Sequence, residues 1–152
     1  MAVSQTLADL GVTLPEVVPP VAAYLPAVVH GDLIYTSGQL PMTGGALPAT
    51  GKVGGAVSAD DAKGYARQSA LNAIAAAAAA VGGVDRLTGV VKVVGFVAST
   101  PDFTGQPGVI NGASELLGQV FGEAGRHARS AVAAPVLPLD SPVEVEVIFS
   151  YV

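Results

Sequence analysis

A long alanine-rich segment constrains the fold of this chain more than any other feature. Ser58, followed closely by two acidic residues, favours the start of a helix, and Gly82 with Gly83 favours its end. Six consecutive alanines at 75–80 lie inside this helix and would allow it to pack closely on a sheet. The helix is also long enough to cross from one strand to another. The segment therefore predicts helices packed on a sheet.

Strand patterns lie on both sides of this helix. Residues 143–151 alternate between apolar side chains and a mostly polar set that includes Glu144 and Glu146, which is the clearest strand pattern in the chain. Residues 90–98 are apolar apart from Lys92, as expected of a strand buried on both faces. Residues 21–29 and 33–37 predict a β-hairpin that turns at His30-Gly31, and residues 128–133 predict a short strand.

A second helix is expected from Pro107 or Asn111 to Glu123, with Gly125 as its stop. The predicted order is then β-β-α-β-α-β-β, which suits one sheet with two helices on one face and places the protein in the α+β class. The length of 152 residues suits a single core.

Two segments lie outside this pattern. Residues 1–20 are expected to form an N-terminal arm, in which Ser4 caps a short helix that Gly11 ends, and residues 21–152 form the domain. Residues 38–55 are rich in glycine and predict a long surface loop. Loops of this length usually have a function or are mobile, and whether this one covers a site is open.

Charged residues are scarce. Only 12% of the residues are charged and 51% are hydrophobic, with a mean hydropathy of +0.55. A monomer of this composition would expose much apolar surface, so we expect the chain to associate with copies of itself. The net charge of −5, without a basic cluster, argues against a nucleic-acid partner. The longest uncharged helical stretch is mostly alanine, and we expect no membrane segment.

The absence of cysteine excludes disulfides and thiol chemistry and fits a cytoplasmic location. His30 and His127 are too few for a metal site, and we expect neither a metal nor a cofactor. A loop around Gly45 and Lys52 resembles a phosphate-binding loop, but its spacing is wrong for one.

Arg129 is the most informative charged residue, because it begins an otherwise uncharged strand and no lysine or arginine follows it. A cation in such surroundings needs an anionic partner. That partner could be Glu144 or Asp140 in a structural ion pair. Alternatively, the guanidinium could bind the carboxylate of a substrate.

Other candidate residues are ordinary when each is taken alone. Glu144 and Glu146 share one face of their strand and could simply face solvent. A tyrosine such as Tyr24 is usually core or rim, Ser37 before a glycine is usually a turn, and Asn111 is usually a helix cap.

Taken together, these residues resemble the reactive-intermediate deaminases of the RidA/YjgF family over residues 21–148. The resemblance rests on Tyr24, on the run from Leu33 through Ser37, Gly38, Gln39, Leu40 and Pro41, on Asn111, on Ala128-Arg129-Ser130, on Leu137-Pro138, and on the stretch from Val143 to Glu146. The two groups of motifs lie at opposite ends of the chain, and both agree with the family.

This resemblance implies a homotrimer with a chorismate-mutase-like fold, a mixed sheet and clefts between subunits. It also implies hydrolysis of 2-imino acids, or their enamine tautomers, to 2-oxo acids and ammonia without a cofactor. Arg129 would bind the substrate carboxylate and Glu144 would act on water. Tyr24, Ser37, Gly38, Asn111 and Ala131 would line the cleft.

The chain departs from the better-known members at Ala131, where they carry cysteine, and in a longer arm and a longer 38–55 loop. These departures motivate an alternative, a non-catalytic protein that binds a carboxylate metabolite. A third hypothesis is the endoribonuclease activity attributed to some relatives, although nothing basic or aromatic here favours RNA binding.

Overall fold

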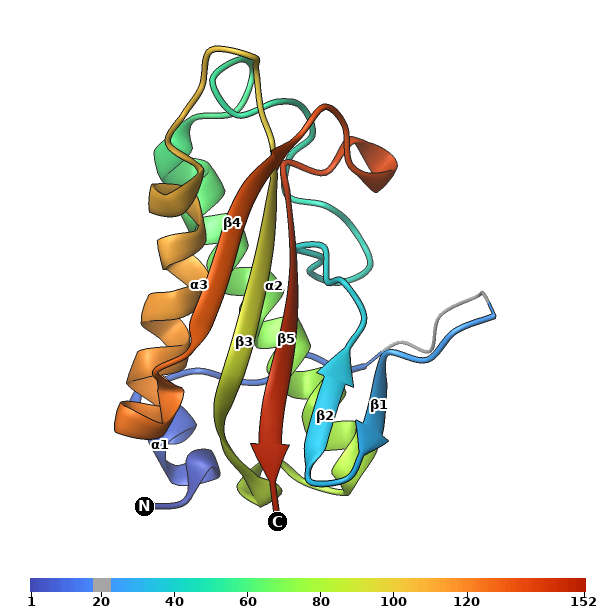
Figure 1. Ribbon diagram of the computed structural model, residues 1–152, viewed down its shortest axis with the longest axis vertical. Coiled ribbons are helices and arrows are strands. Elements are labelled where there is room, and N and C mark those ends of the chain that lie inside the picture. Colours follow the sequence, from blue (N-terminus) through green and yellow to red (C-terminus); the bar gives the residue numbers. More distant parts are fainter. Residues whose placement is uncertain (18–22) are drawn as a thin grey trace.

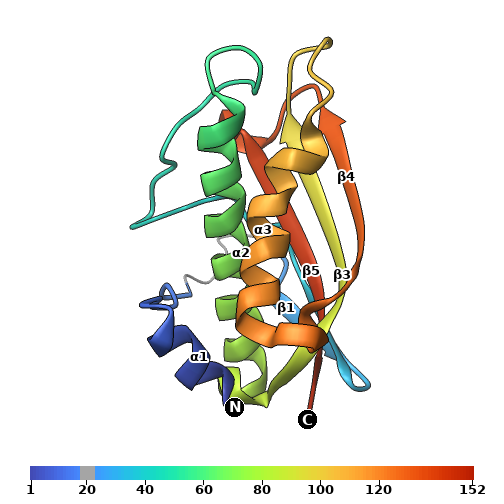
Figure 2. The ribbon, with the colours of Figure 1, turned by 90° about the vertical axis from the view of Figure 1, so that its left-hand side faces the viewer.

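The computed structural model describes residues 1–17 and 23–152, which form a sheet with helices on one side. The strands lie in the order β1-β2-β5-β3-β4, and α2 and α3 cover the same face (Figure 1 and Figure 2). The strands are β1 (Ala27–His30), β2 (Leu33–Thr36), β3 (Leu87–Ala98), β4 (Ala128–Ala134) and β5 (Val143–Tyr151), and the helices are α1 (Val3–Asp9), α2 (Ala59–Val81) and α3 (Gln106–Phe121). This order confirms the predicted β-β-α-β-α-β-β succession and the α+β class.

The sheet is mixed because one pair of its strands runs parallel. β1 with β2, β2 with β5 and β5 with β3 are antiparallel pairs, whereas β3 and β4 are parallel. The chain passes from β3 to β4 through α3, the kind of crossover connection that a parallel pair requires. β4 therefore forms one edge of the sheet and β1 the other.

The helix α2 follows the sequence prediction at both ends. Ser58 Oγ accepts a hydrogen bond of 3.1 Å from the amide of Asp61, and Gly82 adopts a left-handed φ of 84° while its amide bonds to the carbonyl of Ala78. Alanines 73, 75, 76, 77 and 78 are all buried, which lets α2 lie close to the sheet. Within the described ranges, none of the helices is long and apolar enough to cross a membrane.

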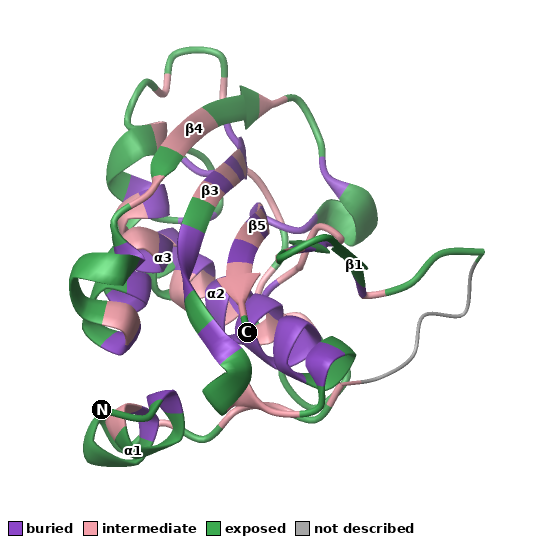
Figure 3. Cartoon of the chain, turned by 60° about the horizontal axis from the view of Figure 1, so that its bottom comes forward, coloured by how far each residue is buried: buried purple, intermediate pink, exposed green. Residues whose placement is uncertain are grey.

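The core lies between the helices and the sheet. Val143, Val145, Val147 and Phe149 of β5 point into it and are almost completely buried. Figure 3 shows buried positions on α2, α3 and the central strands, whereas β4 is intermediate or exposed along its whole length. The opposite face of the sheet keeps apolar side chains at its surface, with Tyr35 42% and Val132 45% exposed. The predicted association between copies would cover this face.

The N-terminal segment differs from its prediction. α1 packs onto the body through buried Val3 and Leu7, and Gly11 ends it with a left-handed φ of 68°. Ser4 does not cap the helix: its amide and hydroxyl donate to the Asp85 carboxylate at 2.7 and 2.8 Å. Ser4 therefore bonds to Asp85, 81 residues away, rather than to the amides at the start of its own helix. The expected boundary between residues 20 and 21 falls in 18–22, outside the described residues.

Two predicted element ends are also wrong. The first strand of the hairpin begins only at Ala27, and the part of that prediction on residues 21 and 22 lies outside the described residues. The helix α3 ends at Phe121, two residues before the expected Glu123, because Gly122 adopts a left-handed φ of 60° and a short 3-10 turn follows.

The 38–55 loop is attached to the body more firmly than a surface loop need be. Asn72 of α2 donates to the carbonyls of Leu40 and Met42 at 2.9 and 3.1 Å. Val53 is completely buried, and its amide bonds to the carbonyl of Ala98 at 2.8 Å. Residues 43–46 at the tip of the loop and residues 54–55 at its end are exposed, as expected.

Candidate active site

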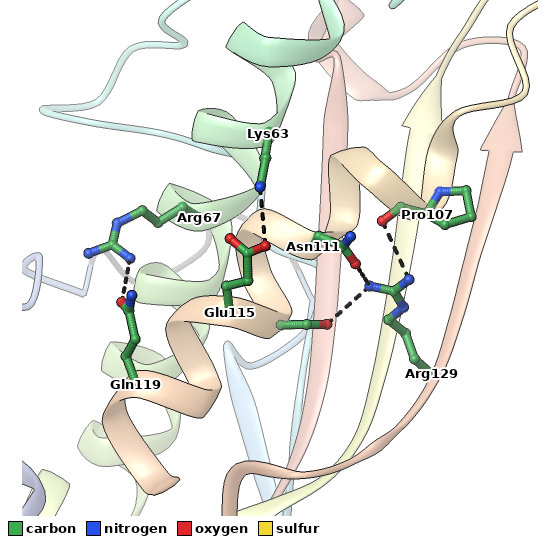
Figure 4. A network of polar contacts seen from close by, with 8 residues as sticks. Lys63, Arg67, Pro107, Asn111, Glu115, Gln119 and Arg129 are labelled. Atoms are coloured by element: carbon green, nitrogen blue, oxygen red, sulfur yellow. Dashed lines mark hydrogen bonds and ion pairs between the residues drawn. The ribbon is translucent and has the colours of Figure 1, made fainter.

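Arg129 lies on the edge strand β4, and its guanidinium reaches toward α3. It pairs with the buried Val93 in the parallel register, which places it on the helix side of the sheet. Nη1 donates to Asn111 Oδ1 at 2.7 Å and to Ser114 Oγ at 3.2 Å, and Nη2 donates to the carbonyl of Pro107 at 3.4 Å (Figure 4). Three neutral acceptors from one helix therefore hold this cation.

No carboxylate forms an ion pair with Arg129 in the described part of the chain. Asp140, one of its expected partners, is paired with Lys52 instead. Glu144, the other expected partner, lies on the opposite face of the sheet, as its alternation with buried Val143 and Val145 requires. The structural ion pair considered from the sequence is therefore wrong, and the guanidinium keeps its capacity for an external anion.

Glu144 lies in a different kind of environment, half-buried against backbone. A Cβ atom placed on Gly38 would lie only 1.9 Å from Glu144 Oε1, so a larger residue there would force this carboxylate to move. Gln39, next in the chain, exchanges backbone hydrogen bonds with Val145 at 2.8 and 3.0 Å, which fixes this contact. Burial raises the pKa of the Glu144 carboxyl above its ordinary value, and the negative charge of Glu146 adds to the rise.

Ser37 and Tyr24 belong to the same end of the sheet as Gly38. Ser37 Oγ donates to the carbonyl of Leu25 at 2.6 Å, and its amide donates to the carbonyl of Pro26 at 2.8 Å. These bonds hold the segment that carries Tyr24 beside the end of β2. The Tyr24 side chain itself is 57% exposed.

The predicted site residues thus fall into two groups that one chain does not join. The arginine group comprises Arg129, Asn111 and Ala131, which lies two residues after Arg129 on the same side of β4. The glutamate group comprises Glu144, Gly38, Ser37 and Tyr24. β3 separates β4 from β5, and the two charged residues point to opposite faces.

Two surface hollows in the described part of the chain lie away from these groups. A cavity of about 400 Å³ lies between the 38–55 loop and the start of α2, where Pro41, Thr43, Asp60 and Asp61 contribute to its lining. It includes none of the predicted site residues. A cleft that holds both groups would therefore have to form between copies of the chain.

Sequence reasoning missed Ser114 and His127. Ser114 Oγ contacts both Arg129 and the ring of His127, at 3.2 and 2.9 Å. The spacing could have suggested both residues, because Ser114 lies one helical turn after Asn111 and His127 lies two residues before Arg129.

The chain belongs to the family described as "YjgF/chorismate mutase-like, putative endoribonuclease", whose model matches residues 4–151. Protein TCP17 of Trypanosoma cruzi is 41% identical over 145 residues, which cover 95% of this chain and 91% of that protein. The crystal structure of Atu1372 from Agrobacterium tumefaciens, described as of unknown function, is 42% identical with a TM-score of 0.89 and covers 99% of this chain and 94% of that one.

A more distant structure is that of Escherichia coli TdcF with bound serine. It is 28% identical, has a TM-score of 0.60, and covers 88% of this chain and 92% of that chain. The difference between the two TM-scores shows that this chain shares more of its shape with the Agrobacterium protein. The family membership predicted from Tyr24, Arg129, Glu144 and their neighbours is confirmed.

Proposed function

We propose that the protein hydrolyses small 2-imino acids, or their enamine tautomers, to 2-oxo acids and ammonia at clefts between the subunits of a homotrimer. One observation carries the proposal: the Arg129 guanidinium is held in place by neutral acceptors and has no carboxylate partner in the described chain. Such a group is suited to bind the carboxylate that every 2-imino acid carries.

The arrangement around Arg129 leaves donors for that carboxylate. Nη1 makes the two shorter bonds, whereas Nη2 makes one long bond of 3.4 Å and Nε makes none within the described residues. Nε and Nη2 can therefore bind both oxygens of a carboxylate at once. The protein has a net charge of −5, so a focused cation is needed to hold an anionic substrate.

Glu144 supplies the proton transfer in this proposal. A raised pKa makes the Glu144 carboxylate a better proton acceptor than an ordinary glutamate, and its acid form can return the proton. The carboxylate takes a proton from water as the water oxygen bonds to the imine carbon. It gives that proton to the imine nitrogen, which forms a carbinolamine. It then takes the remaining proton of the hydroxyl as the C=O bond forms, and gives it to the nitrogen as the C–N bond breaks and ammonia leaves. One water is consumed, one ammonia is released, and no oxidant or reductant is needed.

The trimer enters the proposal because Arg129 and Glu144 point to opposite faces of one sheet. A second copy can bring its glutamate group to the arginine group of the first. The exposed apolar side chains of the open face, such as Tyr35 and Val132, offer the surface for that association. Light scattering should then give a mass three times 15.0 kDa, and a mass near 15.0 kDa would contradict the shared site.

A second candidate function is binding without turnover. The E. coli TdcF structure contains serine, an amino acid with a free carboxylate, and Ala131 stands here where better-known relatives carry cysteine. The same arginine group would serve such a protein. Thermal stabilisation by 2-oxo acids without any turnover of an imino acid would favour this candidate.

The proposal is tested by generating 2-iminopropanoate or 2-iminobutanoate with an amino-acid oxidase and trapping the imine with semicarbazide. The wild-type protein should lower semicarbazone formation by consuming the imine. Arg129→Ala should lose this effect, because removing a charged anchor costs about 2–5 kcal/mol of carboxylate binding.

Arg126→Ala is the matched control, since Arg126 is an exposed arginine three residues away whose one ion-pair partner among residues 1–17 and 23–152 is Glu123. It removes the same charge and should act like wild type. No acceleration by wild type, or equal acceleration by Arg129→Ala, would contradict the proposal. The same preparations should leave RNA intact, and Arg129-dependent RNA cleavage would favour the endoribonuclease hypothesis instead.

A further inference from the structure

Behind Arg129, a series of hydrogen bonds leads away from the guanidinium into the body of the protein. Nη1 lies 3.2 Å from Ser114 Oγ, which lies 2.9 Å from His127 Nε2. The other ring nitrogen, His127 Nδ1, lies 2.6 Å from the carbonyl of Gly125. The mechanism proposed above uses neither Ser114 nor His127.

The donors and acceptors at the two ends of this series fix the direction of each hydrogen bond in it. A carbonyl can only accept, so His127 Nδ1 carries the proton, and in the neutral ring Nε2 is then an acceptor. Ser114 must therefore donate its only hydroxyl proton to Nε2. Its lone pairs are left for Arg129, which can only donate. Every donor thus points from Arg129 toward Gly125.

The fold fixes both ends of this series of hydrogen bonds, Gly125 at one end and Arg129 at the other. Gly125 lies in the short turn after α3, and a Cβ there would come within 2.5 Å of the carbonyl of Leu117. The turn is therefore packed directly on the helix that carries Ser114. Asn111 and Ser114, one helical turn apart, approach the same nitrogen of Arg129 from a single helix face.

We propose that Ser114 and His127 are positioning residues, which fix the Arg129 guanidinium in the orientation that binds a substrate carboxylate. This proposal rests on the carboxylate-binding role given to Arg129 above. Ser114 holds Nη1, so the edge formed by Nε and Nη2 stays turned outward. His127 acts one step further away, by keeping the Ser114 hydroxyl from turning its proton toward the guanidinium.

The proposal predicts a split between binding and turnover. Ser114→Ala and His127→Ala should raise the Kd for 2-oxobutanoate and the KM for the imine about 5- to 30-fold, because the guanidinium loses its fixed orientation but keeps its charge. The kcat should stay close to wild type, because Glu144 is untouched. A merely structural role would instead lower thermal stability and leave Kd unchanged in the folded protein.

A conservative variant separates the hydrogen bond from the packing. His127→Gln can present a carbonyl oxygen to Ser114 in place of Nε2, and it should restore most of the affinity that His127→Ala loses. Glu115→Ala is the control on the same helix, because Glu115 is exposed and pairs with Lys63 of α2, away from Arg129 (Figure 4). Its Kd should equal that of wild type.

The experiment combines calorimetric titration with 2-oxobutanoate and nitrogen-15 NMR of the free protein. The spectra should show His127 protonated at Nδ1, and faster rotation of the Arg129 guanidinium in Ser114→Ala than in Glu115→Ala. A proton on Nε2, unchanged rotation in Ser114→Ala, or an unchanged Kd in both alanine variants would overturn the positioning role.

Failure of the proposed function would look different. In that case wild type and Arg129→Ala would bind 2-oxobutanoate equally well or not at all. The NMR measurements need no ligand, so they would still show whether Ser114 and His127 hold Arg129.

Discussion

The arginine group and the glutamate group are built in different ways. Arg129 is held by side chains, Asn111 and Ser114, that reach it across the space between β4 and α3. Glu144 instead lies against backbone, because Gly38 brings the main chain close to its carboxylate. The arginine group is a network of polar side chains, whereas the glutamate group is a close contact that depends on the absence of a side chain at Gly38.

This difference matches what each residue has to do in the proposed reaction. An arginine is charged at every physiological pH, so the protein controls its orientation rather than its protonation. A glutamate that exchanges protons needs a raised pKa, and partial burial supplies it. We therefore expect substitutions in the arginine group to change binding and those in the glutamate group to change turnover.

Glu144→Gln should have the largest effect on turnover. It keeps the size of the side chain but removes the group that exchanges protons, so kcat should fall about 10²- to 10⁴-fold. The Kd for 2-oxobutanoate should change little. Steady-state kinetics with enzymatically generated 2-iminobutanoate measures the first quantity, and calorimetry measures the second. An unchanged kcat would remove Glu144 from the mechanism.

Gly38→Ala should damage the same group through geometry. The new methyl would lie 1.9 Å from Oε1 and 2.8 Å from Cδ of Glu144, so the carboxylate must move. A displacement of this size can cost about 10²-fold in rate. The unfolding midpoint should move little, because the carboxylate is the flexible end of a side chain.

Gly118→Ala is the control for that substitution. Gly118 lies exposed on α3 with nothing within 4 Å of its added methyl, so the change should leave turnover intact. If both glycine variants kept full activity, the close contact between Gly38 and Glu144 would have no catalytic meaning.

Asn111→Asp tests whether Arg129 in the arginine group binds an anion. The substitution keeps the shape of the side chain but places a carboxylate 2.7 Å from Nη1, where it supplies the ion pair that Arg129 lacks. The new charge should compete with the substrate carboxylate and raise its Kd about 5- to 30-fold. Asn111→Ala should weaken binding less, since Ser114 remains. Tighter binding by the aspartate variant would contradict an anion site at Arg129.

The fold was largely predictable because its strongest determinants are local. The cap at Ser58, the left-handed Gly82 and the alternation along residues 143–151 each specify an element from a few neighbouring residues. The errors occur where distant contacts outweigh local ones. Serine is a residue type that often caps helices, yet Ser4 bonds to Asp85, which lies far from it in the sequence.

The site was predictable in its members but not in its arrangement. Arg129 stood out from the sequence, and the family resemblance supplied Glu144, Tyr24, Ser37 and Asn111. Nothing in their spacing shows that Arg129 and Glu144 face opposite sides of the sheet, because that depends on the register of β3 with both β4 and β5. The turn between α3 and β4 brings Ser114 and His127 together, and only their spacing from Asn111 and Arg129 could have pointed to them.

The smallest expected effect is on how the free energy of unfolding depends on pH, and it has opposite signs for the carboxyl groups of Glu144 and Asp85. Glu144 has a raised pKa, so the folded state binds its proton more tightly and this contribution to stability falls as pH rises above about 4.5. Asp85 has a lowered pKa because the Ser4 amide and then its hydroxyl donate to it, so its contribution falls as pH drops through that pKa.

Glu144→Gln should therefore gain stability relative to wild type as pH is raised from 4 to 7. Asp85→Asn should instead lose stability relative to wild type as pH is raised toward about 3.8 from below, and change little above it. Urea unfolding across both pH ranges measures the two differences. Opposite signs are expected because burial disfavours the charge of Glu144 while hydrogen bonds favour that of Asp85. A Glu144→Gln variant that loses stability as pH rises would show that the carboxylate, not its acid, is the form that the site favours.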